Sequence, residues 1–575
     1  MVSFHAIKKS LSPTFSELFS PSMVVNEPVS YASGPTQNPV CYQYVRGAAR
    51  PDTVLLENVP LDENNEASFT STRFRKVGNG SSEFVEILAS KPVAHVVGAK
   101  PEHQLLQGVS TAEIDFLVQS YFQVVHPVFP ILDPHAFRSS YESTKVDPLL
   151  LTAVCVLCAA WLSTGHGTQE QIDLSGTEGK LWEQLRPALE RPTIPVLQAA
   201  LLLLQGPSQT YQPLSSHLML AAFDLGLHLD CSEWSIDASE KLARKRLGWA
   251  LYAQDKWNSL LLGRPPQLTE TNWLVPDLSE GDFAAGSEGH SVINLEHGAL
   301  LFTQLLVLSR LLASILELFY TASSEAQVRS DTTNGLRLVL ERAKSVQIKL
   351  KDWFAHLSPE LKMDHPDEEK VAANGILHLS YFATEIALHR CIINASVLPG
   401  TDSYLAHVCR SAAKTRLISA MDFVNRLRSQ HFTLSWPLAS TANFGLIGSF
   451  GALLRATAPT HEEAEFYRAR LEEYRWTLGV SRQSAGFLVA ATRVLDRSNE
   501  LLQHVPGKPG MDEFLLTNPH VLGAGAGAGG ARTSMANGQA IQSGSFTQFD
   551  SEDEASSGED DLEMLEDGGY DDNYR

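Results

Sequence analysis

The feature that most limits the possible folds is a helix-type spacing of apolar residues, which continues from about residue 110 to about residue 515. At its start, Ile114, Leu117 and Val118 recur at intervals of three and four residues and so share one face of a helix. The same pattern returns over residues 195–204, 295–320, 336–356, 368–394, 403–430, 444–457, 462–478 and 481–504. We see no convincing alternation of the kind that strands show. The sequence therefore predicts an all-α, multi-helix body in which helices bury one another's apolar faces.

A further long helix is predicted from Asp237 to Leu262. Asp237, with Glu240 three residues later, is typical of a helix start, where side-chain oxygens accept the first free backbone N–H groups. Gly263 and the prolines after it indicate the end of the helix, because glycine tolerates a left-handed cap and proline cannot continue the hydrogen-bond ladder.

Composition divides the chain into three parts. Residues 1–105 mix Ser, Pro, Asn and Gly without a sustained period, and we expect them to be mostly disordered, with a short strand or helical turn at Phe84–Leu88. Residues 106–515 form the predicted regulatory domain. Residues 516–575 begin with a Gly-Ala run and end in a tail, residues 550–575, with twelve acidic residues and one basic residue. We expect this part to be flexible, because it has too few apolar groups to fold alone.

Charge and cysteine usage exclude several classes of protein. A net charge of -21 argues against a dominant basic surface of the kind that binds DNA. Six cysteines in 575 residues are too few for a secreted disulfide framework. No signal peptide is evident, and the apolar stretch 149–162 is shorter than the roughly 20 residues that cross a membrane. The sequence predicts a soluble intracellular protein without a membrane partner.

Two short motifs match the spacing of known binding sites, but each lacks the surrounding sequence that such a site needs. Cys155 and Cys158 have the spacing of half a zinc site, but the second pair is missing and the run is apolar, which favours two small core residues. Gly525–Gly530 matches a nucleotide-binding pattern but lacks the flanking strand and helix, which favours a linker. His126 is interpreted as structural.

No catalytic motif is found, so we predict that the protein is not an enzyme. The alternative is a helical small-ligand-binding protein or an enzyme without a recognised motif.

The basic triplet Arg244–Arg246 has two interpretations. It could contact phosphates or serve as part of a nuclear import signal. Alternatively, it could form a solvated helix face or pair with nearby acids such as Glu240 or Asp255. The second interpretation is favoured.

Aromatic and aliphatic residues in the acidic tail alternate with acids, which is typical of activation segments. A merely solubilising tail is an equal alternative. The residues of this candidate activation segment are Phe546, Phe549, Leu562, Met564, Leu565 and Tyr570.

Residues 121–133, followed by Phe137, and residues 244–266 together resemble the fungal-specific transcription factor domain, the middle homology region of zinc-cluster regulators. The structural signature carried by the second segment consists of Arg246, Trp249, Tyr252, Asp255, Gly263, Arg264 and Pro265. Residues 225–236 and 254–257 are similar to a narrower group, the TamA-type activators of nitrogen-source utilisation genes.

The resemblance implies a nuclear activator or co-activator of RNA polymerase II genes, whose partner is a DNA-bound transcription factor or the transcription machinery. Such regulators hold two zinc ions in a cluster of six cysteines, whereas residues 1–110 contain only Cys41. Either the sequence begins after a zinc cluster, or the protein is recruited by another factor. We therefore expect no cofactor in this chain, and direct DNA contact and homo- or hetero-oligomerisation are left open.

The signature also suggests a local contact. Arginine suits a two-pronged pairing with a carboxylate, and the turn at Gly263 could fold back on the helix. We predict that Asp255 pairs with Arg264, or with Arg244, and so staples the turn.

Overall fold

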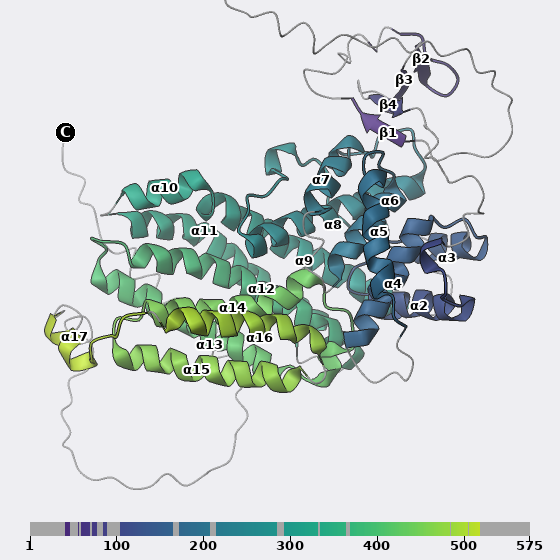
Figure 1. Ribbon diagram of the computed structural model, residues 1–575. Helices are drawn as coiled ribbons and strands as arrows, with labels where there is room; N and C mark the ends of the chain where they lie inside the picture. The colour runs from purple at the N-terminus through teal and green to yellow at the C-terminus, as the bar shows by residue number, and fades with distance from the viewer. Residues whose placement is uncertain are drawn as a thin grey trace, which may run out of the picture. The chain divides into compact units, whose positions relative to one another are not determined.

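The computed structural model describes residues 41–45, 56, 59–69, 72–77, 84–88, 104–164, 172–206, 214–283, 292–331, 334–363, 368–482, 485–503 and 505–517. All of them belong to one compact unit that starts at Cys41. Most of these residues are helical (Figure 1). The α-helices are α2 (Thr111–Val124), α3 (Pro134–Glu142), α4 (Pro148–Thr164), α5 (Ser175–Ala188), α6 (Ile194–Gln205), α7 (Leu214–Asp224), α8 (Ala238–Leu262), α9 (Val292–Phe319), α10 (Ala322–Ser330), α11 (Gly335–Ala355), α12 (Glu368–Ser396), α13 (Ser403–Arg426), α14 (Leu438–Ala456), α15 (His461–Ser481), α16 (Val489–Leu502) and α17 (Met511–Thr517).

Several helices begin at polar caps that the sequence supplies. Ser110 and Glu113 form a reciprocal capping box at the start of α2. Asp133 accepts the backbone N–H of Ala136 at 2.9 Å, and α3 then starts on a proline, whose fixed φ suits the first helical position. Thr193 caps α6 in the same way. These caps satisfy backbone N–H groups that a helix start otherwise leaves without partners.

The longer helices pack in series, and most of them contact helices that come earlier in the chain. α4 packs against α2, α5 and α6; α8 packs against α6 and α9; and α12 packs against α9, α11, α13 and α14. α14 also packs against α15 and α16. Two large hydrophobic clusters result, one mainly from α2 to α12 and the other mainly from α12 to α16.

Helix α12 belongs to both clusters. Leu377 and Ala387 pack into the first cluster, whereas Leu379 and Ile386 pack into the second. A helix that is apolar on opposite faces is stable only when it is covered on both of them. α12 therefore joins the two halves of the helical body, and the expectation of an all-α body is confirmed.

Helix α9 contains the longest apolar stretch of the described chain. An 18-residue window within residues 296–319 has a mean hydropathy of 2.0, so by length and composition this stretch could cross a membrane, which the shorter stretch 149–162 could not. However, 67% of the apolar window is buried inside the protein, and α8, α11 and α12 cover it. Its apolar character is accounted for by its place in the core.

A small antiparallel sheet precedes the helices. Its strands are β1 (Cys41–Tyr44), β2 (Glu66–Ser68), β3 (Arg73–Lys76) and β4 (Phe84–Leu88), in the order β1-β4-β3-β2. Val77 and Val85 pack with Leu229, Cys231 and Trp234, from the segment between α7 and α8.

The sequence pattern does not predict this sheet, except at β4, where a strand is one of two expectations. The strands are only three to five residues long, so alternation has too few positions to register. They gain stability from tertiary contact: the ring of Tyr44 stacks on that of Trp234 at 5.8 Å.

Candidate functional site around helix α8

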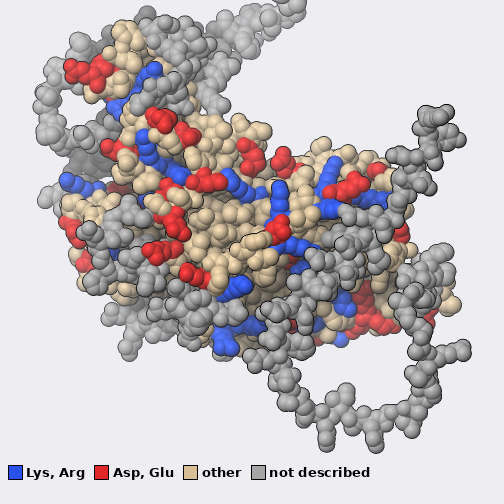
Figure 2. Space-filling model, turned by 180° about the vertical axis from the view of Figure 1, so that it is seen from behind, with Lys and Arg blue, Asp and Glu red and all other residues tan. Residues whose placement is uncertain are grey.

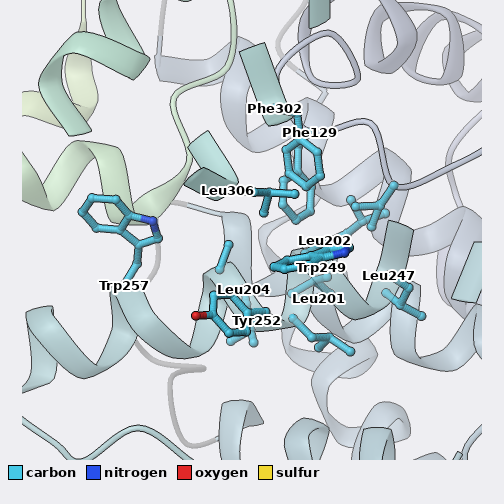
Figure 3. Packing of buried hydrophobic residues seen from close by; sticks show 14 of the residues in the cluster. Phe129, Leu201, Leu202, Leu204, Leu247, Trp249, Tyr252, Trp257, Phe302 and Leu306 are labelled. Atoms are coloured by element: carbon cyan, nitrogen blue, oxygen red, sulfur yellow. The ribbon is translucent and has the colours of Figure 1, made fainter. Parts of the chain in front are cut away.

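Helix α8 carries the family signature and is buried along most of its length. Its apolar residues pack between α6 and α9, and Figure 3 shows Trp249 and Tyr252 among Leu201, Leu202 and Leu204 of α6. Gly248 allows a close approach, because a Cβ atom at this position would lie 2.7 Å from the carbonyl oxygen of Leu227. The middle of α8 therefore forms part of the core.

The first turns of α8 are held by Arg244. Its Nε atom lies 2.9 Å from Glu240 Oε1, its Nη1 atom donates to the Leu225 carbonyl at 2.8 Å, and its guanidinium lies 5.2 Å from the centre of the Trp234 ring. Asp237 occupies the predicted N-cap position, but its side chain forms no capping hydrogen bond. The position of the helix start is thus confirmed, and the predicted capping contact is wrong, because Glu240 pairs with Arg244 instead.

Lys245 and Arg246 both contact Asp282. Lys245 Nζ lies 2.8 Å from Asp282 Oδ2, and Arg246 Nη1 donates to the Asp282 carbonyl at 2.7 Å. Burial raises the pKa of Asp282, but the hydrogen bonds from Lys245 and Ser279 outweigh this and lower it. The predicted pairing with Glu240 is thus confirmed for Arg244, whereas the prediction of a solvated face is wrong: the three side chains tie α8 to the chain before and after it.

Three aromatic rings fasten the segment after α8 to the helix. Trp249, Tyr252 and Trp273 lie within 5.1 to 5.2 Å of one another, measured between ring centres. Trp249 Nε1 donates to the Pro276 carbonyl at 2.8 Å, and the Arg310 guanidinium lies 4.5 Å from the Trp249 ring centre. Burial and the hydrogen bond to a glutamate raise the pKa of Tyr252 well above its ordinary value. The signature aromatic residues thus position the loop that follows the helix.

Asp255 holds the turn by a different contact from the one predicted. Its carboxylate accepts the backbone N–H groups of Gln267 and Leu268 at 2.9 and 3.0 Å, and Lys256 Nζ lies 3.2 Å from it. Lys256 is also buried and donates to the Leu268 carbonyl.

Arg264 is exposed, and no hydrogen bond or ion pair joins it to Asp255 in the part of the chain that the structure describes. Gly263 ends α8 in the left-handed conformation with φ 62°, as predicted. The proposed Asp255–Arg264 staple is therefore corrected. The turn brings backbone N–H groups, rather than a guanidinium, to the buried carboxylate.

The sequence motifs considered as binding sites lie in the core. Cys155 and Cys158 are fully buried in α4, and burial raises the pKa of Cys158 to about 12, which disfavours the thiolate that metals require. His126 is buried, its Nε2 atom lies 3.0 Å from the Leu132 carbonyl oxygen, and burial lowers its pKa to about 4. Among the described residues, no group of three or more His, Cys, Asp or Glu side chains is placed to hold a metal ion.

A small cavity lies beneath α8, between His228, Gly248, Leu268 and Trp273. Its volume of about 10 Å³ is close to the space that one water molecule needs. This cavity is too small to hold a metabolite.

Sequence reasoning missed several residues that complete this site. Trp273, Asp282 and Arg310 close the contacts around α8, but nothing in their spacing identifies them, since they meet α8 only through the tertiary fold. Lys256 lies on α8 itself, and only its burial beside Asp255 marks it as part of the site. The six candidate activation residues from Phe546 to Tyr570 and the Gly525–Gly530 run lie outside the described residues.

Comparison with known proteins identifies related sequences. Residues 118–355 match the family model of the fungal specific transcription factor domain. The transcriptional activator protein DAL81 of Saccharomyces cerevisiae is 29% identical over 526 residues, which cover 83% of this chain and 53% of that protein. An uncharacterized transcriptional regulatory protein of Schizosaccharomyces pombe is 30% identical, covering 49% of this chain and 44% of its own.

The transcriptional activator protein acu-15 of Neurospora crassa is 27% identical, covering 52% of this chain and 33% of that protein. The chain thus spans about half the length, or less, of these curated relatives. No solved structure matches the chain. The matched region begins within α2 and ends with α11, so it includes every signature residue of α8 and its turn. Residues 118–355, which contain α8 and its turn, are therefore similar to the fungal-specific transcription factor domain.

Proposed function

We propose that this chain regulates the transcription of RNA polymerase II genes in a fungal nucleus, as an activator or co-activator that works through protein contacts. The observation that carries this proposal is its relationship, over 83% of its length, to a protein named as a transcriptional activator. Its partner would be a DNA-bound transcription factor or a component of the transcription machinery.

The contacts of α8 support recruitment through protein rather than through DNA. The basic residues of the signature helix are engaged inside the protein, so they are not presented to phosphates. Figure 2 shows lysines and arginines interspersed with acids on the face in view, without a continuous basic surface. Proteins that bind DNA mainly by their surface need clustered cations there.

We further propose that the regulated genes serve the use of nitrogen sources. This rests on the similarity of residues 225–236 and 254–257 to the TamA-type activators. In the structure, residues 225–236 supply the carbonyl and the indole ring that hold Arg244, and residues 254–257 include the Asp255 and Lys256 pair.

Two experiments test these proposals. The full chain, fused to a heterologous DNA-binding domain in a fungal reporter strain, should raise reporter output well above that of the DNA-binding domain alone; an unchanged output would contradict the activator role. A deletion strain should grow poorly when GABA, urea or allantoin is its sole nitrogen source and normally on ammonium. Equal growth on all of these sources would refute the nitrogen role alone.

A further inference from the structure

The short helix α17 presents the most exposed large apolar side chain in the described part of the chain. Leu516 is 84% exposed, although apolar area stabilises a protein only where it is removed from water. Single exposed leucines are common on protein surfaces, so the groups beside this one decide what it can do. Those groups, and the way in which the helix is held, point to a contact surface.

Carboxylates stand beside Leu516. Asp512 and Glu513 lie four and three residues before it, so the three side chains share one face of the helix. Both acids are exposed, no ion pair joins either of them to another described residue, and α17 has no basic residue. Acids in a first turn favour the helix dipole, but the dipole gives no reason for a leucine in water on the same face. We call Asp512, Glu513 and Leu516 the α17 face.

Hydrogen bonds fix the start of α17 to the helical body, and Figure 1 shows it at one end of that body. Glu462 of α15 accepts the backbone N–H of Met511 at 3.2 Å. The carbonyl of Pro509 accepts the N–H of His461 at 2.8 Å. The ammonium group of Lys508 donates to a carbonyl at the end of α14 at 3.0 Å, so it is turned toward the body. A seven-residue helix is marginal alone in water, so these contacts hold the α17 face in place and lower the entropy cost of binding.

The charges of the α17 face select one kind of partner. Exposed helices bind other proteins by placing apolar anchors in a groove, and complementary charges at its rim determine which partner is accepted. Two carboxylates without counter-charges match lysines or arginines at that rim. A second copy of this chain carries a net charge of -21 and so offers, on balance, a like-charged surface. The occupant that fits is therefore a different protein with a cationic rim around an apolar groove.

We propose that α17 is a docking helix, and that its face binds an apolar groove rimmed by lysines or arginines on another protein. Leu516 enters the groove, and Asp512 and Glu513 pair with its rim. That this partner belongs to the transcription machinery rests on the proposed function. The contact itself rests on the exposure, the charge and the anchoring of α17.

The test places a photo-reactive amino acid at position 516 of the full-length chain, in fungal cells, and identifies the cross-linked products by mass spectrometry. A matched control places it at Leu220 of α7, which is 61% exposed. Position 516 should cross-link one other protein about tenfold more strongly than position 220 does, at a peptide that combines lysine or arginine with apolar residues.

Two charge variants, made with the photo-reactive group still at position 516, test the carboxylates. Asp512→Lys with Glu513→Lys should lower the yield about fivefold to tenfold. Asp512→Asn with Glu513→Gln keeps the shapes of the side chains, and it should lower the yield by a smaller factor. The control variant, Glu341→Lys with Asp352→Lys, makes the same charge change on exposed acids of α11 and should leave the yield unchanged.

Equal cross-linking from both positions, cross-links to the same chain or to a second copy, an acidic partner peptide, or a yield that survives charge reversal would each overturn the proposal. A charge-dependent cross-link to one protein with a basic rim, found in a chain that fails the reporter assay, would support the docking helix and refute the proposed function instead.

Discussion

The buried carboxylate of Asp255 offers the sharpest test of how the family signature works. The change Asp255→Asn keeps the shape of the side chain and removes its charge. In the wild type, this carboxylate accepts two backbone N–H groups and neutralises Lys256, whose side chain is only 2% exposed. After the change, the ammonium group stays buried beside the Leu268 carbonyl and the Tyr252 ring, whose centre lies 4.8 Å away, and it has lost its counter-charge.

Removing one partner of a buried ion pair typically destabilises a protein by about 3 to 5 kcal/mol. We expect Asp255→Asn to lie in this range, because the amide can still accept one of the two backbone N–H groups while Lys256 loses its counter-charge. The double variant Asp255→Asn with Lys256→Met should cost less than the single one, since it removes the uncompensated charge as well. Arg264→Ala should cost less than about 0.5 kcal/mol, as exposed positions usually do.

The measurement is a urea unfolding curve for each variant at constant protein concentration, read by tryptophan fluorescence. Wild type, both single variants and the double variant form a cycle, and Arg264→Ala serves as the surface control. Our reasoning would be refuted if Asp255→Asn unfolded within about 1 kcal/mol of wild type, or if Arg264→Ala cost as much as Asp255→Asn.

Three further perturbations follow from the described contacts. Gly248→Ala should destabilise the protein by about 1 to 3 kcal/mol in a urea unfolding curve, because its Cβ atom would meet the Leu227 carbonyl at 2.7 Å; an unaffected midpoint would show that the backbone moves aside easily. Burial raises the pKa of the Glu385 carboxyl group, although Arg416 nearby opposes this. The folded chain therefore binds the carboxyl proton more tightly than the unfolded chain does. The stability that the protonated carboxyl group supplies is lost as pH rises through the raised pKa. Glu385→Gln should therefore gain stability relative to wild type as pH rises above 4.5, the ordinary pKa of this side chain, and a difference that does not vary with pH would contradict this. Cys158, whose pKa is about 12, should resist iodoacetamide at pH 7.5 in the native protein and react in urea, as mass spectrometry of the labelled peptides can establish.

Much of the helical body could be predicted because its helices are long. The predicted segments 368–394 and 462–478 correspond to α12 and α15 with ends that differ by a few residues. Periodicity is clear in such segments, since several turns repeat the same face. It was less informative for the short helix α10, which spans nine residues and is mostly polar. The sheet strands were shorter still, and their stability depends on contacts with the segment after α7.

The candidate site shows the same division at the level of single side chains. Spacing alone indicated that Trp249, Tyr252 and Asp255 belong to one helix and that Gly263 ends it, because these are local properties of the backbone. Spacing could not indicate which groups they meet. Whether a basic triplet faces solvent depends on what packs over it, and Asp282 reaches Lys245 from 37 residues away.

The sequence by itself therefore determined the helical class, the bounds of the long helices and the family signature, since each follows from residues close together in the chain. Only the tertiary structure decided that Arg244, Lys245 and Arg246 are internal ties, that Asp255 holds backbone N–H groups rather than Arg264, and that α9 is a core helix. The physical reason is that burial and ion pairing depend on the distance between atoms in space, and packing brings together groups that the sequence separates.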